Sequence, residues 1–238
     1  MATYVLVHGS WGSAWHWHRV RPLLEAQGHR VLTPTLLGLG ERADHASEDV
    51  GLGAHIDDVV GLLDEEGLAD AVLVGHSYGG MVVTGVAARS AGRVDQVVYV
   101  DAFAPDPGQS AFDILPWLGD AFSADVDAER PWAIPPMDFA ALGVEDPADL
   151  AELTARATAM PRLTHEEPLP TDERDVLQAM KATYVWCTRQ PLFADVAAAM
   201  RTRQIETVEL DTGHYPMLSD PKSMVRLLLA CADSEEKS

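Results

Sequence analysis

The stretch that decides the fold is Val72-Leu-Val-Gly-His-Ser-Tyr-Gly-Gly-Met81, in which an apolar run ends abruptly in Gly75-His-Ser-Tyr-Gly79. The pentapeptide fits the pattern G-x-S-x-G, and apolar residues at helical spacing follow it. A serine on a sharp strand-to-helix turn has a strained backbone, and flanking glycines relieve the crowding. The alternative is a glycine-bearing turn with an incidental serine. The strand before and the helix after favour Ser77 as a nucleophile, facing the N-terminal N–H groups of that helix.

Apolar β-rich runs and amphipathic helical patterns alternate on both sides of this stretch. Strands are expected at 4–7, 29–33, 72–75, 96–101, 183–188 and 206–210, and helices at 15–27, 52–66, 192–203 and 216–232. Alternating strands and helices are typical of a parallel sheet with right-handed crossovers. The pattern therefore predicts an α/β fold, with an open, mostly parallel sheet of about six strands flanked by helices.

The alternation breaks between residues 103 and 183, which hold most of the 15 prolines. No strand is expected there, and short helices are expected around 148–160 and 172–181. Because the segment is too long for a loop, we interpret 104–182 as an inserted, mainly helical cap. The α/β core would then consist of residues 1–103 and 183–238. We call residues 104–182 the cap segment.

Composition restricts the classes of function. The 238 residues are 47% hydrophobic, which suits one folded α/β unit, and the net charge of −20 disfavours nucleic acid and anionic membranes as partners. Cys187 and Cys231 lie in apolar runs, without disulfide or metal spacing. We expect a strand, and not a signal peptide, at the start of this sequence, and no apolar run reaches membrane-spanning length. We expect a cytoplasmic monomer or homodimer that acts on a small molecule and needs no cofactor or metal.

A serine hydroxyl needs a base to take its proton. In an open α/β sheet the base comes from another loop at the carboxyl ends of the strands. His214 follows the last expected strand and fits the order Ser…acid…His, although it could be a surface residue. The oxyanion needs two donors, for which we predict the backbone N–H groups of Tyr78 and Ser10. The alternative for His8-Gly9 is a simple strand-ending turn.

Four stretches together resemble the α/β-hydrolase superfamily, and more narrowly the plant methyl esterase and hydroxynitrile lyase family with its bacterial relatives. They are His8-Gly-Ser-Trp-Gly-Ser-Ala-Trp15, Pro22-Leu-Leu-Glu-Ala-Gln-Gly-His29, Gly75-His-Ser-Tyr-Gly-Gly-Met81 and Gly213-His214. The resemblance covers the core well and the cap segment hardly at all. It implies Ser77 as nucleophile, His214 as base, and N–H donors at Ser10 and Tyr78.

The acid of the expected triad departs from this resemblance. The plant enzymes keep an aspartate after the strand equivalent to 183–188, where this chain has Gln190. Asp101 is the best replacement because it ends the strand after the nucleophile's strand. It could instead anchor a turn or the cap. Asp195 is better explained as a helix-dipole acid, and Asp211 is too close in sequence to His214.

The lyases of the family carry threonine where Gly9 stands and lysine where Tyr215 stands, which favours ester hydrolysis here. We therefore predict a serine esterase acting on a small, largely apolar carboxylic ester. Its pocket is expected to be lined by Gly9, Trp11, Phe103, Trp117 and Trp132. Two alternatives stay open: a cofactor-free lyase or ring-modifying enzyme on the same fold, and a small-molecule binding protein with residual hydrolase machinery.

Overall fold

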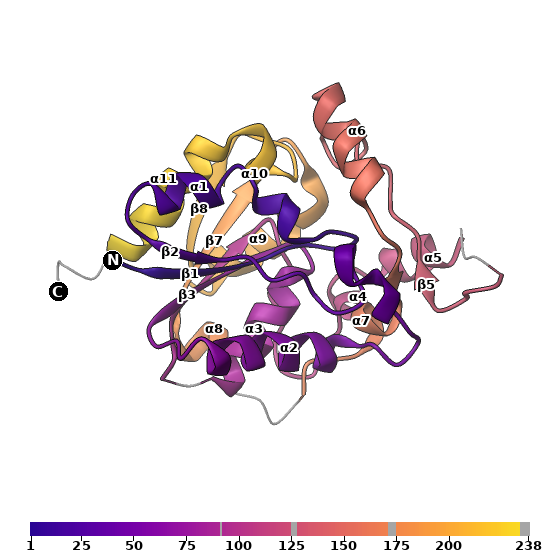
Figure 1. Cartoon of the computed structure of the whole chain (residues 1–238), viewed down its shortest axis with the longest axis horizontal. Coiled ribbons are helices and arrows are strands. Elements are labelled where there is room, and N and C mark those ends of the chain that lie inside the picture. Colours follow the sequence, from indigo (N-terminus) through magenta and orange to yellow (C-terminus); the bar gives the residue numbers. More distant parts are fainter. Residues whose placement is uncertain (91, 125–127, 171–174, 234–238) are drawn as a thin grey trace.

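A six-stranded parallel sheet forms the centre of the protein (Figure 1), in the strand order β2-β1-β3-β4-β7-β8. The computed structural model describes residues 1–90, 92–124, 128–170 and 175–233. The strands are β1 (Thr3–Val7), β2 (Arg30–Leu32), β3 (Ala71–His76), β4 (Val94–Val100), β7 (Lys181–Cys187) and β8 (Glu206–Leu210). The predicted α/β class and parallel sheet are confirmed.

The strand that leads to Ser77 lies at the middle of the sheet. All six residues of β3 are buried, and Leu73 pairs in register with Val5 of β1 and Val97 of β4. Strands covered on both faces are continuous apolar runs, which explains why this stretch shows no alternation of polar residues. The turn after β3 is therefore built on the most rigid part of the core.

Helices cover both faces of the sheet (Figure 1). On one face lie α2 (Leu52–Glu65) and α3 (Gly79–Arg89), and on the other lie α1 (Arg21–Glu25) and α11 (Pro221–Asp233). α9 (Ala194–Thr202) packs against β7 and β8. Residues at helical spacing on α2 face the core: Leu52, His55, Ile56, Val59 and Leu63.

Two expected helices are interrupted. The first becomes the 3₁₀ turn η1 (Ala14–Trp17) followed by α1, and the last becomes α10 (Pro216–Ser219) followed by α11. Pro221 begins α11, and a proline cannot continue a preceding helix because it lacks an N–H. The further 3₁₀ turns are η2 (Gly40–His45) and η3 (Pro191–Phe193).

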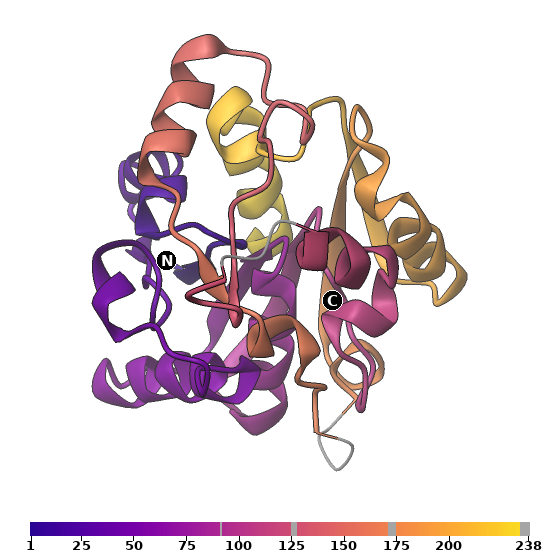
Figure 2. The ribbon, with the colours of Figure 1, turned by 90° about the vertical axis from the view of Figure 1, so that its right-hand side faces the viewer.

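Most of the cap segment lies beyond the carboxyl ends of the strands, and Figure 2 looks onto it, whereas its last helix lies beside α3. Its helices are α4 (Ala111–Ile114), α5 (Trp117–Ala124), α6 (Pro147–Arg156), α7 (Leu163–Glu166) and α8 (Val176–Ala179). The expectation of no strand there is wrong: β5 (Ala133–Ile134) and β6 (Met160–Pro161) form an antiparallel pair. Two-residue strands are too short to produce a period in the sequence. Part of the helix expected at 172–181, residues 172–174, lies outside the described residues.

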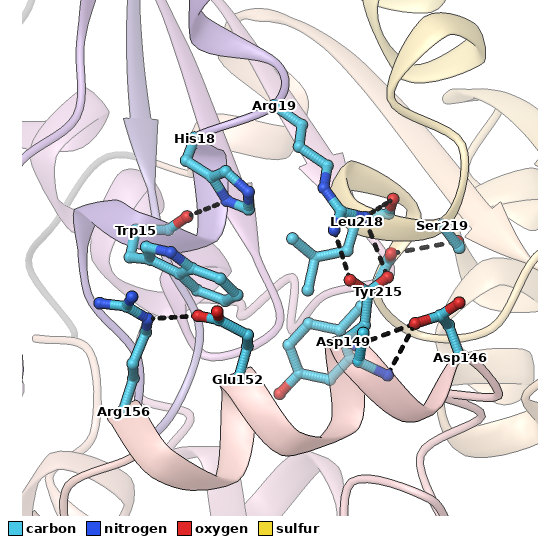
Figure 3. Close-up of polar contacts among 11 residues, drawn as sticks. Trp15, His18, Arg19, Asp146, Asp149, Glu152, Arg156, Tyr215, Leu218 and Ser219 are labelled. Carbon is cyan, nitrogen blue, oxygen red and sulfur yellow. Dashed lines mark hydrogen bonds and ion pairs between the residues drawn. The ribbon is translucent and has the colours of Figure 1, made fainter.

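Helix α6 is fastened to the core by charged side chains (Figure 3). The Arg19 guanidinium donates to both carboxylate oxygens of Asp149 and to the backbone carbonyl of Leu218. At the other end of α6, the Arg156 guanidinium lies 4.9 Å from the centre of the Trp15 ring. These contacts tie α6 to the segment that follows β1. Among the described helices, none combines the length and apolar character needed to cross a membrane.

Candidate active site

Ser77 lies in the sharp turn between β3 and α3, with φ of +53°. A Cβ atom added to Gly75 would lie 2.6 Å from the Gly79 carbonyl oxygen, and one added to Gly79 would lie 2.7 Å from the Val7 carbonyl oxygen. Both flanking glycines are therefore required by close backbone approach. The turn directs the Ser77 side chain into a cavity between the sheet and the cap segment.

His214 and Asp101 meet at the carboxyl ends of two strands. His214 follows β8, Asp101 follows β4 with φ of +43°, and His214 Nδ1 lies 2.7 Å from Asp101 Oδ2. The other carboxylate oxygen accepts the backbone N–H of Cys187 at 3.2 Å. Left-handed backbone at non-glycine residues stores roughly 1–3 kcal/mol each and gathers at functional sites. Ser77 and Asp101 both show it.

The other candidates for the acid do not contact His214. Gln190, at the position of the usual aspartate, donates from Nε2 to the Ala141 carbonyl oxygen at 2.6 Å. Asp211 is ion-paired with Arg189, and Asp195 is exposed in the first turn of α9. Only Asp101, of the carboxylates weighed from the sequence, lies beside the imidazole.

Burial disfavours charge on both partners of this contact. It lowers the pKa of His214 and raises the pKa of Asp101, whereas the 2.7 Å contact between them stabilises the Asp101 carboxylate. The His214 ring is therefore neutral at rest. Because Nδ1 faces a carboxylate oxygen, the proton belongs on Nδ1, and Nε2 is the nitrogen able to accept one.

Ser77 and His214 line the same cavity but are not hydrogen-bonded to each other in this structure. Contacts of this kind are commonly long in the absence of substrate and tighten when it binds. The cap segment also holds His214, because its backbone N–H donates to the Leu142 carbonyl oxygen at 3.1 Å. The imidazole is thus positioned from both the core and the cap segment.

The two predicted oxyanion donors flank Ser77. Within the described ranges, the backbone N–H groups of Ser10 and Tyr78 donate no hydrogen bond to the protein. Gly9 packs directly behind the serine, since a Cβ atom added to it would lie 2.8 Å from Ser77 Cβ. Trp11, after Ser10, has φ of +59°, another left-handed residue beside the site.

The cavity is mostly apolar and only partly as expected. Trp11 and Phe103 line it, but Gly9, Trp117 and Trp132 do not, and Trp117 is 48% exposed. On α5 the residues that line the cavity are Leu118, which follows Trp117, and Phe122. No helix was expected at 117–124, so the sequence did not indicate that Leu118 and Phe122, four residues apart, share the inward face of α5. The residues that it missed are Leu118, Phe122, Met137, Leu142, His165, Leu192, Phe193 and Tyr215.

His165 is the most informative of these, because it is a buried polar side chain from the cap segment. Nothing in the surrounding sequence marks it as part of the site. Within the described residues, no cluster of three or more His, Cys, Asp or Glu side chains is arranged to hold a metal ion.

Comparison with known proteins finds similar chains among named esterases. The chain is 51% identical over 116 residues to the carbendazim hydrolyzing esterase of Nocardioides sp. (strain SG-4G). This match covers 49% of this chain and 48% of that protein. It is 27% identical to Methylesterase 7 of Arabidopsis thaliana over 97% of this chain and 96% of that one. The first curated relatives are thus matched over about half of their length. These curated relatives are esterases by name.

The similarity extends to a solved structure over nearly the whole chain. An extracellular alpha/beta-hydrolase from a Paenibacillus species, described as homologous in structure and function to tobacco salicylic acid binding protein 2, superposes with a TM-score of 0.84. It is 26% identical and covers 97% of this chain and 99% of that one. A model of the alpha/beta hydrolase family matches residues 4–227. The chain therefore belongs to the alpha/beta hydrolase family.

Proposed function

We propose that this protein is a serine esterase that cleaves a small, largely apolar carboxylic ester through an acyl-enzyme. The observation that carries the proposal is the 2.7 Å contact between Asp101 Oδ2 and Nδ1 of His214, whose ring lines the same cavity as Ser77. An imidazole fixed by a carboxylate on one nitrogen, beside a serine on a strained turn, is the arrangement that activates a hydroxyl.

In the proposed reaction the Ser77 oxygen attacks the ester carbonyl carbon while His214 Nε2 takes the hydroxyl proton. The negative charge on the carbonyl oxygen is held by the N–H groups of Ser10 and Tyr78. Collapse of this intermediate expels the alcohol, which receives the proton from His214. Water, activated by the same imidazole, then releases the acid from Ser77.

The lining of the cavity supports an apolar substrate. Aromatic and aliphatic side chains such as Phe103, Leu118 and Phe122 dominate it. Such a wall favours the apolar portions of an ester. The names of the relatives, a carbendazim hydrolyzing esterase and a plant methylesterase, point to the same class of reaction.

The test uses p-nitrophenyl acetate and a serine-directed phosphonate. Ser77→Ala should abolish both turnover and labelling, while the far-UV circular dichroism spectrum and the urea midpoint stay as in the parent. Peptide mapping of the labelled parent should find the phosphonate on Ser77. Hydrolysis by Ser77→Ala at the parental rate would refute the mechanism.

A further inference from the structure

The residue that carries one proposed oxyanion donor is held by the cap segment. Three hydrogen bonds from that segment reach the Ser10–Trp11 turn. Trp11 Nε1 donates to the Ile134 carbonyl oxygen at 3.2 Å, and Thr158 N donates to the Trp11 carbonyl oxygen at 3.1 Å. Ser10 Oγ lies 3.2 Å from His165 Nε2. This turn is therefore built jointly by the β1 loop and a segment more than 120 residues away in sequence.

The direction of the Ser10–His165 bond follows from the neighbouring contacts. Thr164 Oγ1 donates its single proton to the Pro161 carbonyl oxygen at 2.6 Å. Its oxygen must therefore accept from His165 Nδ1, which lies 2.9 Å away. Burial, with the nearby His55 and Arg162, lowers the pKa of His165 to about 3, so the ring is neutral. A neutral ring protonated on Nδ1 can only accept at Nε2, and Ser10 Oγ–H is the donor.

The second donor residue is fixed in the same manner, but from the core. His55, on α2, has Nε2 2.8 Å from the Leu37 carbonyl oxygen, so that nitrogen carries the proton. Burial lowers the pKa of His55 to about 4, and its Nδ1 accepts the Tyr78 hydroxyl at 2.9 Å. Each proposed donor residue thus gives its hydroxyl proton to a neutral imidazole, one in the core and one in the cap segment.

We propose that His165 is a positioning residue that orients Ser10, so that the oxyanion hole is complete only when the cap segment is docked on the core. This inference rests on the proposed function, since it concerns the same oxyanion. His165 acts on the reaction through Ser10: without the bond the serine hydroxyl can rotate, and the backbone N–H beside it loses its fixed direction.

A phenylalanine at position 165 removes both hydrogen bonds of the ring, to Ser10 and to Thr164, and keeps an aromatic ring among its neighbours. The His165 ring stacks on Tyr78 with ring centres 4.9 Å apart and also contacts the rings of Phe103, Phe112 and Phe122. The aromatic rings around His165 can therefore also pack against the ring of a phenylalanine at this position. Glutamine is the conservative replacement, because its amide oxygen can reach the position of Nε2 and accept from Ser10.

The experiment measures kcat, KM and the inhibition constant of an apolar trifluoromethyl ketone. Ser77 Oγ adds to the carbonyl carbon of this inhibitor, His214 takes the proton, and the oxyanion enters the hole. His165→Phe should lower kcat about tenfold or more. This loss should be smaller than the loss on removal of a whole oxyanion-hole donor, which is about 10²- to 10³-fold. KM should change by less than about twofold, and the inhibitor should weaken by the same factor as kcat. His165→Gln should restore most of the loss.

Two further variants separate positioning from general loosening. Asp149→Asn weakens the Arg19 contact shown in Figure 3, so it loosens the cap segment without touching Ser10. It should leave kcat and inhibitor binding within about twofold of the parent. Ser10→Ala keeps the backbone N–H but removes the partner of His165. The double variant with His165→Phe should therefore lose no more than the worse single variant.

The inference is overturned if His165→Phe keeps parental kcat and inhibitor affinity, if Asp149→Asn loses as much, or if the two losses multiply in the double variant. Failure of the proposed function looks different. The parent itself would then hydrolyse no ester and bind the ketone no better than Ser77→Ala does.

Discussion

Mild acid should unfold this protein, because five histidines outside the His214–Asp101 pair are buried in neutral form. They are His8, His16, His55, His76 and His165. Burial lowers the pKa of each ring: to about 4 for His8 and His55, to about 3 for His165, and well below the usual value for the other two. In the unfolded chain each ring has a pKa near 6.5. Below that pH the unfolded state takes up protons that the folded state does not, so stability is lost as pH falls.

The magnitude follows from the number of rings. Between pH 7.5 and pH 5.5, each buried ring lowers the free energy of unfolding by about 1.4 kcal/mol, so the five rings together lower it by about 7 kcal/mol. The His214 and Asp101 shifts act in opposite directions on this balance and offset each other. A domain of ordinary stability has about 5–15 kcal/mol in total. About half of that stability or more should therefore disappear within two pH units, before exposed carboxylates begin to titrate.

The assay is urea unfolding followed by far-UV circular dichroism at pH 7.5, 6.5 and 5.5. In His16→Phe, the loss of unfolding free energy between pH 7.5 and pH 5.5 should be smaller by the contribution of one ring, about 1.4 kcal/mol. It removes a buried Nδ1 that has no hydrogen-bond partner, so it should not destabilise the protein at pH 7.5 through a lost bond. The exposed His45 provides the matched control, and His45→Gln should keep the parental pH dependence. Equal free energies of unfolding at pH 7.5 and 5.5 would refute the reasoning.

Two further substitutions test the geometry of the site. Asp101→Asn should lower kcat on p-nitrophenyl acetate by up to about 10⁴-fold while the fold persists, because an amide cannot stabilise the imidazolium. The control Gln190→Ala loses only the bond to the Ala141 carbonyl oxygen, so its kcat should stay within about twofold of the parental value. A larger loss of kcat in Gln190→Ala than in Asp101→Asn would contradict the assignment of the acid. Gly79→Ala should destabilise the protein by about 1–3 kcal/mol, because the new methyl group meets the Val7 carbonyl oxygen. A urea midpoint unchanged from the parent would show that the turn has more room than the structure indicates.

The features that could be predicted from the sequence depend on local patterns. β3 and the turn after it are encoded by an apolar run and two glycines, and the parallel sheet by the alternation of strands and helices. His214 and Asp101 could be proposed because parallel strands end at one edge of the sheet, so residues that follow them are brought together. The interruption of the last helix at Pro221 was also readable from the residue type, although the expectation joined the two pieces.

The arrangement of the cap segment was decided only in three dimensions. Trp117 and Leu118 are neighbours in sequence, yet Leu118 lines the cavity and Trp117 is exposed, because α5 presents one face to the core. His165 shows no motif, and its bond to Ser10 joins residues 155 positions apart. Sequence patterns report on periods of a few residues, whereas such contacts depend on how separate elements dock. The nucleophile turn was therefore determined by the sequence alone, and the polar contacts around it by the packing of the cap segment against the sheet.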